Sequence, residues 1–427
     1  MKIKVCDAIM GSGKTSATIN LFNSQPDKKY IYITPYLDEA KRIKDSCPEL
    51  KFVEPNNSLP EYKFSKYNHT MELLQDGRNI TSTHQMFGMY TPETIEVIRE
   101  QGYTLVIDEA VDTFEDAKMT ADDFNLLKAA GWLSDKEQHM SIDTHDYKKG
   151  RMEKFASLAK SNRLVQLSRK EGGYTKKVYY WMLSKEIFES FEDVYILTYL
   201  FDHQTMKYYF DLNDVQFEKI WISHPSKNEY YFSTSFDYMP EYIKDLEKKI
   251  HIFDNEKLND IGEDRCALSS SWIDRAIADP KQEHIGELRR NIRNYFRNYY
   301  EDIPASARLW SVFTKAEPFI RDKGFFRSDL AFNKKATNEF RDKTVLAYCV
   351  NIFMQTCVKQ HFIANGIKVN EDGYALSIMV QWIWRSAIRD GKEVWLYIPS
   401  KRMRTLLINW INETQQLYYD IKESKGA

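Results

Sequence analysis

The chain has 427 residues, of which 43% are hydrophobic and 14% aromatic, and its formal net charge at pH 7 is −2. This length and composition predict a globular protein of two or three domains, each large enough to bury its own core. The small net charge excludes a uniformly basic nucleic-acid-binding protein, so contact with nucleic acid must come from local patches.

The first predicted element is a short apolar strand at residues 2–5, which runs into the sequence Ala8-Ile9-Met10-Gly11-Ser12-Gly13-Lys14-Thr15. Gly11 and Gly13 allow the backbone to curl with its N–H groups pointing inward, and a helix at residues 16–22 offers its positive N-terminus to the same anion. Lys14 would reach the β- and γ-phosphates, and the Thr15 hydroxyl would bind Mg²⁺. The predicted phosphate-binding residues are Gly11, Ser12, Gly13, Lys14, Thr15 and Ser16.

The cellular location is predicted from what the sequence lacks. No apolar run approaches the roughly 18 residues that a membrane helix needs, and the phosphate loop begins too early to leave room for a signal peptide. The five cysteines are scattered without metal-binding spacing, which is typical of free thiols in a reducing compartment. We therefore expect a cytoplasmic protein with no membrane contact.

The next elements alternate between strands and helices. Strands are predicted at residues 30–35, 79–87 and 103–107, with a polar helix at 37–46 between the first two. The run at 103–107 is continuously apolar, as in strands buried on both faces of a parallel sheet. This alternation predicts an α/β domain whose ligand lies at the carboxyl ends of its strands.

The pattern from about 112 to 190 favours a helical, charged insertion. Between residues 148 and 177 there are ten Lys or Arg residues against two Glu residues. This basic segment either faces phosphates or forms solvated helix surfaces. A buried strand at 194–199 then closes the first domain.

The second half has the same α/β character. We expect domain 1 at residues 1–210, a connector at 211–245 and domain 2 at 246–427. Strands are predicted at 249–253, 309–313, 329–333 and 394–399, and helices at 287–300, 344–362 and 375–389.

Two acidic residues follow the buried strand at 103–107. Asp108 at the strand end can hold the Mg²⁺ that bridges the phosphates, and Glu109 can orient or deprotonate an attacking water. An acidic turn with no further role is the alternative for this pair. The phosphate loop earlier in the chain favours the catalytic interpretation.

A third group of residues lies near the C-terminus. Arg385 and Arg389 are four residues apart, so on a helix they share one face. Two guanidinium groups there could stabilise charge on a transferring phosphate as arginine fingers. The alternative is a surface helix whose Trp382 and Trp384 pack inward.

Taken in order, these motifs, together with Thr34-Pro35, Thr-Ser-Thr-His-Gln-Met-Phe, Leu-Thr-Tyr and Gln-x-x-x-Arg-x-x-x-Arg, resemble superfamily 2 helicases of the DEAD-like group, of the type encoded by bacteriophages and prophages. The resemblance implies two RecA-like parallel-sheet domains with ATP between them and a nucleic-acid strand across both. It also implies that Gln381 acts with Arg385 and Arg389, and that Thr198 couples hydrolysis to movement. The residues that fall at the family's nucleic-acid contacts are Thr34, Pro35, Thr81, Ser82, Thr83, His84, Asn333 and Thr337.

Three departures from the family pattern are visible. Tyr199 replaces the small residue of the coupling motif. In the last motif Trp384 stands where the pattern has Gly and the second Arg comes one residue late, which favours Arg385 as the arginine finger. No adenine-reading glutamine segment precedes the phosphate loop, so base recognition is expected elsewhere.

The expected function is an ATP- and Mg²⁺-dependent nucleic-acid translocase or helicase. Its expected partners are single-stranded DNA and proteins of phage replication or recombination. One alternative is a nucleotide-gated module that binds DNA or a partner protein without unwinding. The other is the ATPase of a DNA-packaging terminase, which would need a nuclease domain with clustered carboxylates.

Overall fold

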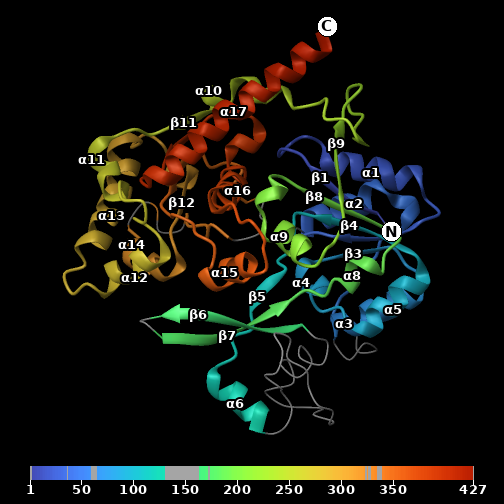
Figure 1. Ribbon diagram of the computed structural model, residues 1–427. Helices are drawn as coiled ribbons and strands as arrows, with labels where there is room; N and C mark the ends of the chain where they lie inside the picture. The colour runs from blue at the N-terminus through green and yellow to red at the C-terminus, as the bar shows by residue number, and fades with distance from the viewer. Residues whose placement is uncertain are drawn as a thin grey trace. The chain divides into compact units, whose positions relative to one another are not determined.

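The computed structural model describes residues 2–426 apart from 36, 59–64, 130–162, 172–173, 323–324, 326–327 and 334–338. The chain divides into two compact units, which are described separately (Figure 1). The first comprises Met1–Ala8, Gly13–Phe236 and Gln355–Val369, and the second comprises Ile9–Ser12, Asp237–Met354 and Asn370–Ala427. Residues 355–369 therefore belong to the first unit, although they fall within the second domain predicted at 246–427.

A seven-stranded sheet forms the centre of the first unit, in the order β10-β9-β1-β8-β4-β2-β3. All its neighbouring strands are parallel except β10, which runs antiparallel to β9. In sequence order the strands are β1 (Lys2–Asp7), β2 (Lys29–Ile33), β3 (Ile80–Ser82), β4 (Tyr103–Asp108), β8 (Asp193–Thr198), β9 (Glu218–Ser223) and β10 (Tyr231–Ser233). All six residues of β4 are buried, as its continuous apolar run predicted.

Seven helices of this unit follow or connect these strands: α1 (Lys14–Ser24), α2 (Leu37–Ser46), α3 (Lys66–Gln75), α4 (His84–Phe87), α5 (Pro92–Gln101), α8 (Glu186–Glu189) and α9 (Thr205–Leu212). The strand predicted at 79–87 ends at Ser82. It ends there because the Thr83 side chain accepts a hydrogen bond from the backbone N–H of Met86 and caps α4.

The insertion after β4 differs from the helical prediction. It contains α6 (Ala121–Ala129) and a three-stranded antiparallel sheet in the order β5-β7-β6, formed by β5 (Phe114–Asp116), β6 (Leu164–Glu171) and β7 (Tyr174–Met182) (Figure 1). Charge density suggested helices, but β-branched and aromatic residues such as Val178, Tyr179 and Tyr180 favour a pleated, half-buried surface. Much of the basic segment, residues 148–162, lies outside the described residues.

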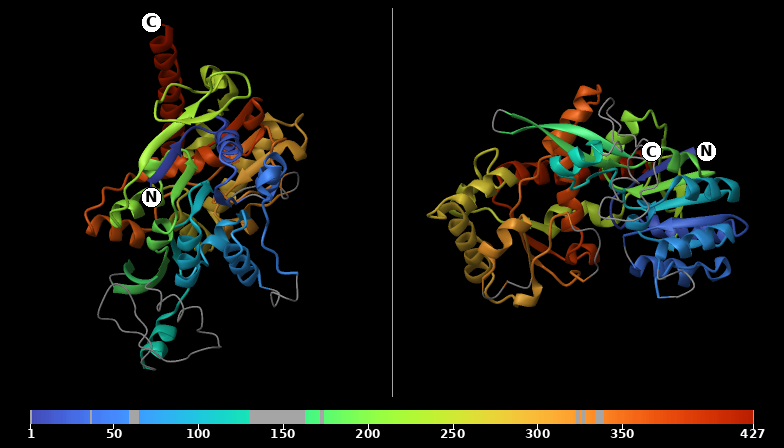
Figure 2. Two further views of the ribbon diagram at one scale, coloured as in Figure 1. Left: turned by 90° about the vertical axis from the view of Figure 1, so that its right-hand side faces the viewer. Right: turned by 90° about the horizontal axis from the view of Figure 1, so that it is seen from below.

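A parallel four-stranded sheet forms the centre of the second unit, in the order β11-β14-β13-β12. Its strands are β11 (Ile250–Ile252), β12 (Arg308–Ser311), β13 (Val345–Tyr348) and β14 (Val394–Tyr397). The helices are α10 (Leu246–Lys249), α11 (Glu256–Asn259), α12 (Ser270–Ala278), α13 (Glu283–Asn294), α14 (Glu317–Ile320), α16 (Glu371–Ile383) and α17 (Lys401–Gly426). Figure 2 shows α17 as one unbroken helix that runs to the C-terminus.

The helix predicted at 344–362 and the strand predicted at 329–333 are both wrong in part. The stretch 344–362 begins as β13, whose four residues are all buried, and becomes helical only in α15 (Thr356–Ala364). Sheet packing overrides the helical spacing at its start. The predicted strand at 329–333 is reduced to a single bridge between Asp329 and Trp310 in the described residues.

The helix predicted at 375–389 also ends early. α16 stops at Ile383, because the backbone N–H and the hydroxyl of Ser386 both donate to the Ile383 carbonyl oxygen. A separate short 3-10 helix then covers Ala387–Asp390. Across the described residues, no helix is both long and apolar enough to span a membrane.

Candidate nucleotide site

The glycine loop between β1 and α1 has the backbone conformation that the sequence predicted. Gly11 and Gly13 have φ angles of 74° and 93°, a region that residues with a Cβ rarely adopt. Gly13 is the N-cap residue of α1, and the first turn of this helix contains no acidic side chain. The positive helix terminus is therefore not neutralised locally, which suits an anion.

Lys14 is held at the start of α1. Its Nζ donates a hydrogen bond to the Ala8 carbonyl oxygen. Burial lowers the pKa of Lys14, and the nearby charges of Asp108 and Glu109 act in the opposite direction. Lys14 therefore lies within electrostatic range of both acidic residues, which are more than ninety residues later in the sequence.

The sheet explains why these groups meet. The order β1-β8-β4 places only one strand between the loop and Asp108. Asp7 pairs with Thr198, and Asp108 pairs with Leu197, so the three strands end at nearly the same level. Neighbouring strands are about 4.8 Å apart, so the loop and the carboxylate lie about 10 Å apart at one edge.

Asp108 is a buried carboxyl group with a perturbed pKa. Asp108 is 8% exposed. Burial, with a smaller contribution from repulsion by Glu109 and Glu39, raises the pKa of its carboxyl group to about 7. Lys14 opposes this shift. The Thr34 hydroxyl donates to Asp108 Oδ2 over 3.4 Å. A carboxyl group that is costly to ionise in isolation suits a site where a cation completes the charge balance.

Glu109 has a left-handed backbone, with φ of 62°. This conformation is uncommon for a residue with a side chain, and such conformations cluster at functional sites. The Glu109 N–H donates to the Leu197 carbonyl oxygen over 2.9 Å, and His84 Nε2 is 2.9 Å from the Asp108 carbonyl oxygen. These bonds fix the backbone of the acidic pair from two sides.

Thr198 occupies the strand end between the loop and the acidic pair. Its carbonyl oxygen accepts a hydrogen bond from the Ala8 N–H over 3.0 Å, and its hydroxyl is bonded to the Gln204 side-chain amide. The residue after it, Tyr199, has its carbonyl oxygen bonded to Gln204 Nε2 over 2.8 Å. Thr198 thus contacts the phosphate loop, in the position that the resemblance assigns to a coupling residue.

Tyr230 is a neighbour of the loop that sequence reasoning missed. A Cβ added to Gly13 would lie 2.1 Å from Cδ1 of the Tyr230 ring. Asn20 of α1 donates to the Tyr230 carbonyl oxygen over 2.8 Å, and the His224 ring stacks on Tyr230 with a centroid distance of 4.2 Å. No spacing rule connects residues 13 and 230, so only the packing of β10 beside α1 identifies this contact.

Mg²⁺ and a nucleotide fit the chemistry of these residues. The glycine loop offers backbone N–H groups, Thr15 offers a hydroxyl, and Asp108 offers a buried carboxyl group at the end of β4. Mg²⁺ is usually bound by one or two such protein oxygens together with substrate phosphates. The described residues contain no group of three metal-binding side chains, which a metal cage independent of phosphate would need.

The residues predicted to contact nucleic acid differ in how far they are exposed to solvent. Thr34, Thr81 and Ser82 are buried, with exposures of 1%, 0% and 6%. Their side chains face the interior of the first unit, so direct contact with a strand would require them to move. Pro35, Thr83 and His84 are partly exposed and Asn333 is exposed, whereas Thr337 lies outside the described residues.

The arginine motif belongs to the second unit. Arg385 is 5% exposed and follows the end of α16, while Arg389 is exposed in the 3-10 helix. The prediction that both share one helix face is therefore wrong. Nε and Nη1 of Arg385 are buried, and in the described part of the chain they have no hydrogen-bond partner. Gln381 lies on α16 and is partly exposed.

These features define an α/β protein with two mainly parallel sheets and an inserted antiparallel one, in which the first sheet carries a glycine loop and an acidic pair at one edge. Residues 244–411 match the family model described as the YonV C-terminal Rossmann-like domain. The SPbeta prophage-derived protein YonV of Bacillus subtilis (strain 168) is 36% identical over 422 residues, which cover 96% of this chain and 98% of that protein. The chain therefore belongs to the family of YonV-type prophage proteins.

Solved structures give more distant likenesses. The Xpd4 structure from S. tokodaii has a TM-score of 0.49 at 12% identity and covers 96% of this chain and 94% of its own. An apo XPD structure has a TM-score of 0.46 at 11% identity, with 95% of each chain covered.

Proposed function

We propose that this chain is an ATP-dependent nucleic-acid translocase or helicase of the DEAD-like type, acting on DNA during phage replication or recombination. One observation carries the proposal. Lys14, at the start of the helix after β1, and the pair Asp108-Glu109, at the end of β4, are distant in sequence but lie at the same edge of one sheet. A phosphate loop facing an acidic pair is an arrangement suited to hydrolysis as well as to binding.

Each residue has a defined role in the proposed reaction. Lys14 and the loop amides bind the β- and γ-phosphates, and Thr15 and Asp108 hold Mg²⁺, which would neutralise charge on these phosphates. Glu109 orients the attacking water and accepts its proton. Its fixed backbone keeps the carboxylate in position, and positioning of this kind contributes much of the acceleration in phosphoryl transfer.

Arg385 is the proposed arginine finger. Its buried guanidinium has two nitrogen atoms without a partner in the described residues, and unpaired buried polar groups are costly. A phosphate oxygen would satisfy these donors. Arg389 and Gln381 are assigned supporting roles, because Gln381 lies on α16 and Arg389 lies in the separate 3-10 helix, whereas Arg385 lies between these two elements.

ATP hydrolysis measured with single-stranded DNA, duplex DNA, RNA and no nucleic acid tests the proposal. We expect single-stranded DNA to stimulate hydrolysis, and Lys14→Ala and Glu109→Gln each to lower the rate by at least about 100-fold. Lys41→Ala changes an exposed lysine of α2 and should leave the rate unchanged. Wild-type rates in either site variant would show that the assignment is wrong.

A nucleotide-gated binding module is a second candidate, favoured by the separation of Arg385 from Arg389. In that case ATP would strengthen DNA binding without being consumed. DNA affinity measured with ATP and with a non-hydrolysable analogue, alongside turnover, separates the two functions. Equal strengthening by both nucleotides with no turnover would favour the module.

A further inference from the structure

A turn at residues 224–230 lies beside the glycine loop. It joins β9 to β10. β9 runs parallel to β1, with Cys6 paired to Ile220, so β9 ends at the sheet edge that carries the loop (Figure 1). β10 then returns antiparallel to β9 and packs beside α1. The turn therefore belongs to the same compact unit as Lys14 and the acidic pair, and to the same edge of their sheet.

Two aromatic rings of this turn lie next to the loop. A Cβ added to Gly13 would be 2.1, 2.5 and 2.7 Å from three neighbouring carbons of the Tyr230 ring, so it would sit above the ring face rather than outside its rim. The His224 ring stacks on Tyr230, with centroids 4.2 Å apart and planes within 7° of each other. Both residues are half-buried, so the pair still presents surface to solvent.

The turn holds this ring pair in place by its own hydrogen bonds. His224 Nδ1 is 2.8 Å from the Glu229 carbonyl oxygen, and the Glu229 N–H donates to the Ser226 carbonyl oxygen over 3.0 Å. The Ser226 hydroxyl donates to the Glu229 carboxylate. Asn20 of α1 donates to the Tyr230 carbonyl oxygen over 2.8 Å, which ties the turn to the helix after the loop. The rings are thus positioned before any ligand binds, which lowers the entropic cost of binding.

The strand order sets the direction in which a nucleotide would lie. In the order β9-β1-β8-β4, the acidic pair ends the strand two places to one side of β1, and the turn follows the strand next to β1 on the other side. Glu109 acts on the terminal phosphate in the proposed reaction, so the γ-phosphate lies toward β4. The ribose and base, at the opposite end of the triphosphate, then extend toward β9 and the ring pair.

We propose that His224 and Tyr230 form the nucleobase-binding surface of the site, on which the base of the bound nucleotide stacks. The inference rests on the proposed function, because it places the other end of the same nucleotide. It also assigns the base recognition that no motif of the sequence accounts for.

Stacking of this kind predicts a particular selectivity. It requires only a π-face, which every base has, and the Ser226 hydroxyl, the Glu229 backbone and carboxylate, and His224 Nδ1 are engaged with one another within the turn. The turn therefore contributes stacking rather than recognition of base edges. We expect ATP and GTP to bind within about fivefold of each other, and CTP and UTP to bind more weakly because their rings are smaller.

The test compares the Kd of ATP with that of inorganic triphosphate in the full chain with Mg²⁺, because triphosphate carries the phosphates without the base. Tyr230→Ala should raise the Kd of ATP by roughly 5- to 150-fold, the range for loss of one base–aromatic stack, and change that of triphosphate by less than about twofold. His224→Ala should weaken ATP binding with the same selectivity.

Three variants separate stacking from packing. Tyr230→Phe keeps the ring and should bind ATP as the wild type does. Tyr230→Leu keeps bulk over Gly13 without a π-face and should lose ATP affinity as Tyr230→Ala does. Tyr231→Ala, at an exposed tyrosine of β10, is the matched control and should change neither Kd.

Four results would overturn the base-binding surface. They are wild-type ATP affinity in a folded Tyr230→Ala or His224→Ala protein, full ATP affinity in Tyr230→Leu, an equal rise in both Kd values in Tyr230→Ala, and a wild-type chain that binds ATP no more tightly than triphosphate. Thermal unfolding shows whether each variant is folded. Failure of the proposed function looks different, because that chain would bind neither ligand at the loop, or would bind ATP without hydrolysing it.

Discussion

Replacing Asp108 with Asn should have opposite effects on stability and on Mg²⁺ binding. In the folded chain the pKa of Asp108 is raised from an ordinary 3.8 to about 7, mainly by burial. A raised carboxyl pKa means that the folded state binds the proton more tightly than the unfolded state. The stability from this group is therefore fully present below about pH 4 and is lost as the pH rises through about 7.

The magnitude follows from the size of the shift. One pKa unit corresponds to about 1.4 kcal/mol, so ionised Asp108 costs up to about 4 kcal/mol above pH 7 in the metal-free protein. Asn carries no charge and can still accept the Thr34 hydrogen bond. We expect Asp108→Asn to raise the free energy of unfolding by about 2 kcal/mol near pH 8, because the amide recovers only part of this cost.

Urea unfolding across the pH range, with and without Mg²⁺ and ATP, measures both effects. The wild-type protein should lose stability between about pH 4 and pH 7 and regain it with Mg²⁺ and ATP, whereas the variant should show neither change from this site. Asp27→Asn, in the exposed turn after α1, is the control and should follow the wild type. A variant that is less stable than the wild type near pH 8 without Mg²⁺ would refute the reasoning.

Two further predictions concern packing. Gly13→Ala should weaken nucleotide binding and destabilise the first unit by about 1–3 kcal/mol, since φ is 93° and the new Cβ would lie 2.1 Å from the Tyr230 ring. Adding Tyr230→Ala should relieve only the clash, and full recovery of the melting temperature would rule out backbone strain. Phe362→Ala should cost about 3–5 kcal/mol in thermal unfolding, because the ring is fully buried against Phe114 and Tyr208. Ile363→Ala, exposed on the same helix, should cost little, and equal losses would contradict the packing of α15 on β5.

Local patterns were sufficient for the strands that form the sheet centres. The continuous apolar run of β4 and the glycines of the loop have one physical outcome each: burial on both faces and a left-handed turn. The insertion was misjudged, because charge density says little about backbone conformation. The pairing of β6 with β7 depends on register between strands, which the analysis of individual segments did not capture.

The arginine motif shows the limit of helical spacing. Arg385 and Arg389 are four residues apart, a spacing that would place them on one helix face. α16 nevertheless ends before both of them, where Ser386 donates a hydrogen bond to the Ile383 carbonyl oxygen. A serine hydroxyl can compete with the backbone hydrogen bonds that continue a helix. Whether the helix ends there depends on the burial of the segment, which the local sequence does not determine.

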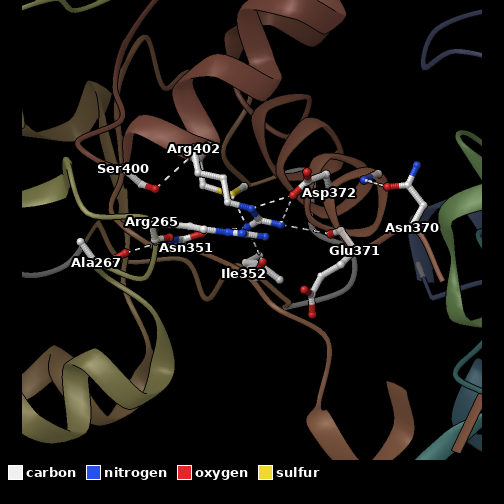
Figure 3. Close-up of polar contacts among 11 residues, drawn as sticks. Arg265, Ala267, Asn351, Ile352, Asn370, Glu371, Asp372, Ser400 and Arg402 are labelled. Carbon is white, nitrogen blue, oxygen red and sulfur yellow. Dashed lines mark hydrogen bonds and ion pairs between the residues drawn. The ribbon is translucent and has the colours of Figure 1, made fainter. Parts of the chain in front are cut away.

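The sequence by itself determined the glycine loop, the acidic pair and the alternation of strands and helices, because each depends on neighbouring residues. Tertiary structure alone decided that Lys14 and Asp108 lie at one sheet edge, that Tyr230 packs on Gly13, and that Arg402 bonds both Asn351 and Glu371 (Figure 3). These contacts join residues separated by tens to hundreds of positions. Strand order and packing create these contacts, and no local spacing of residues along the chain predicts them.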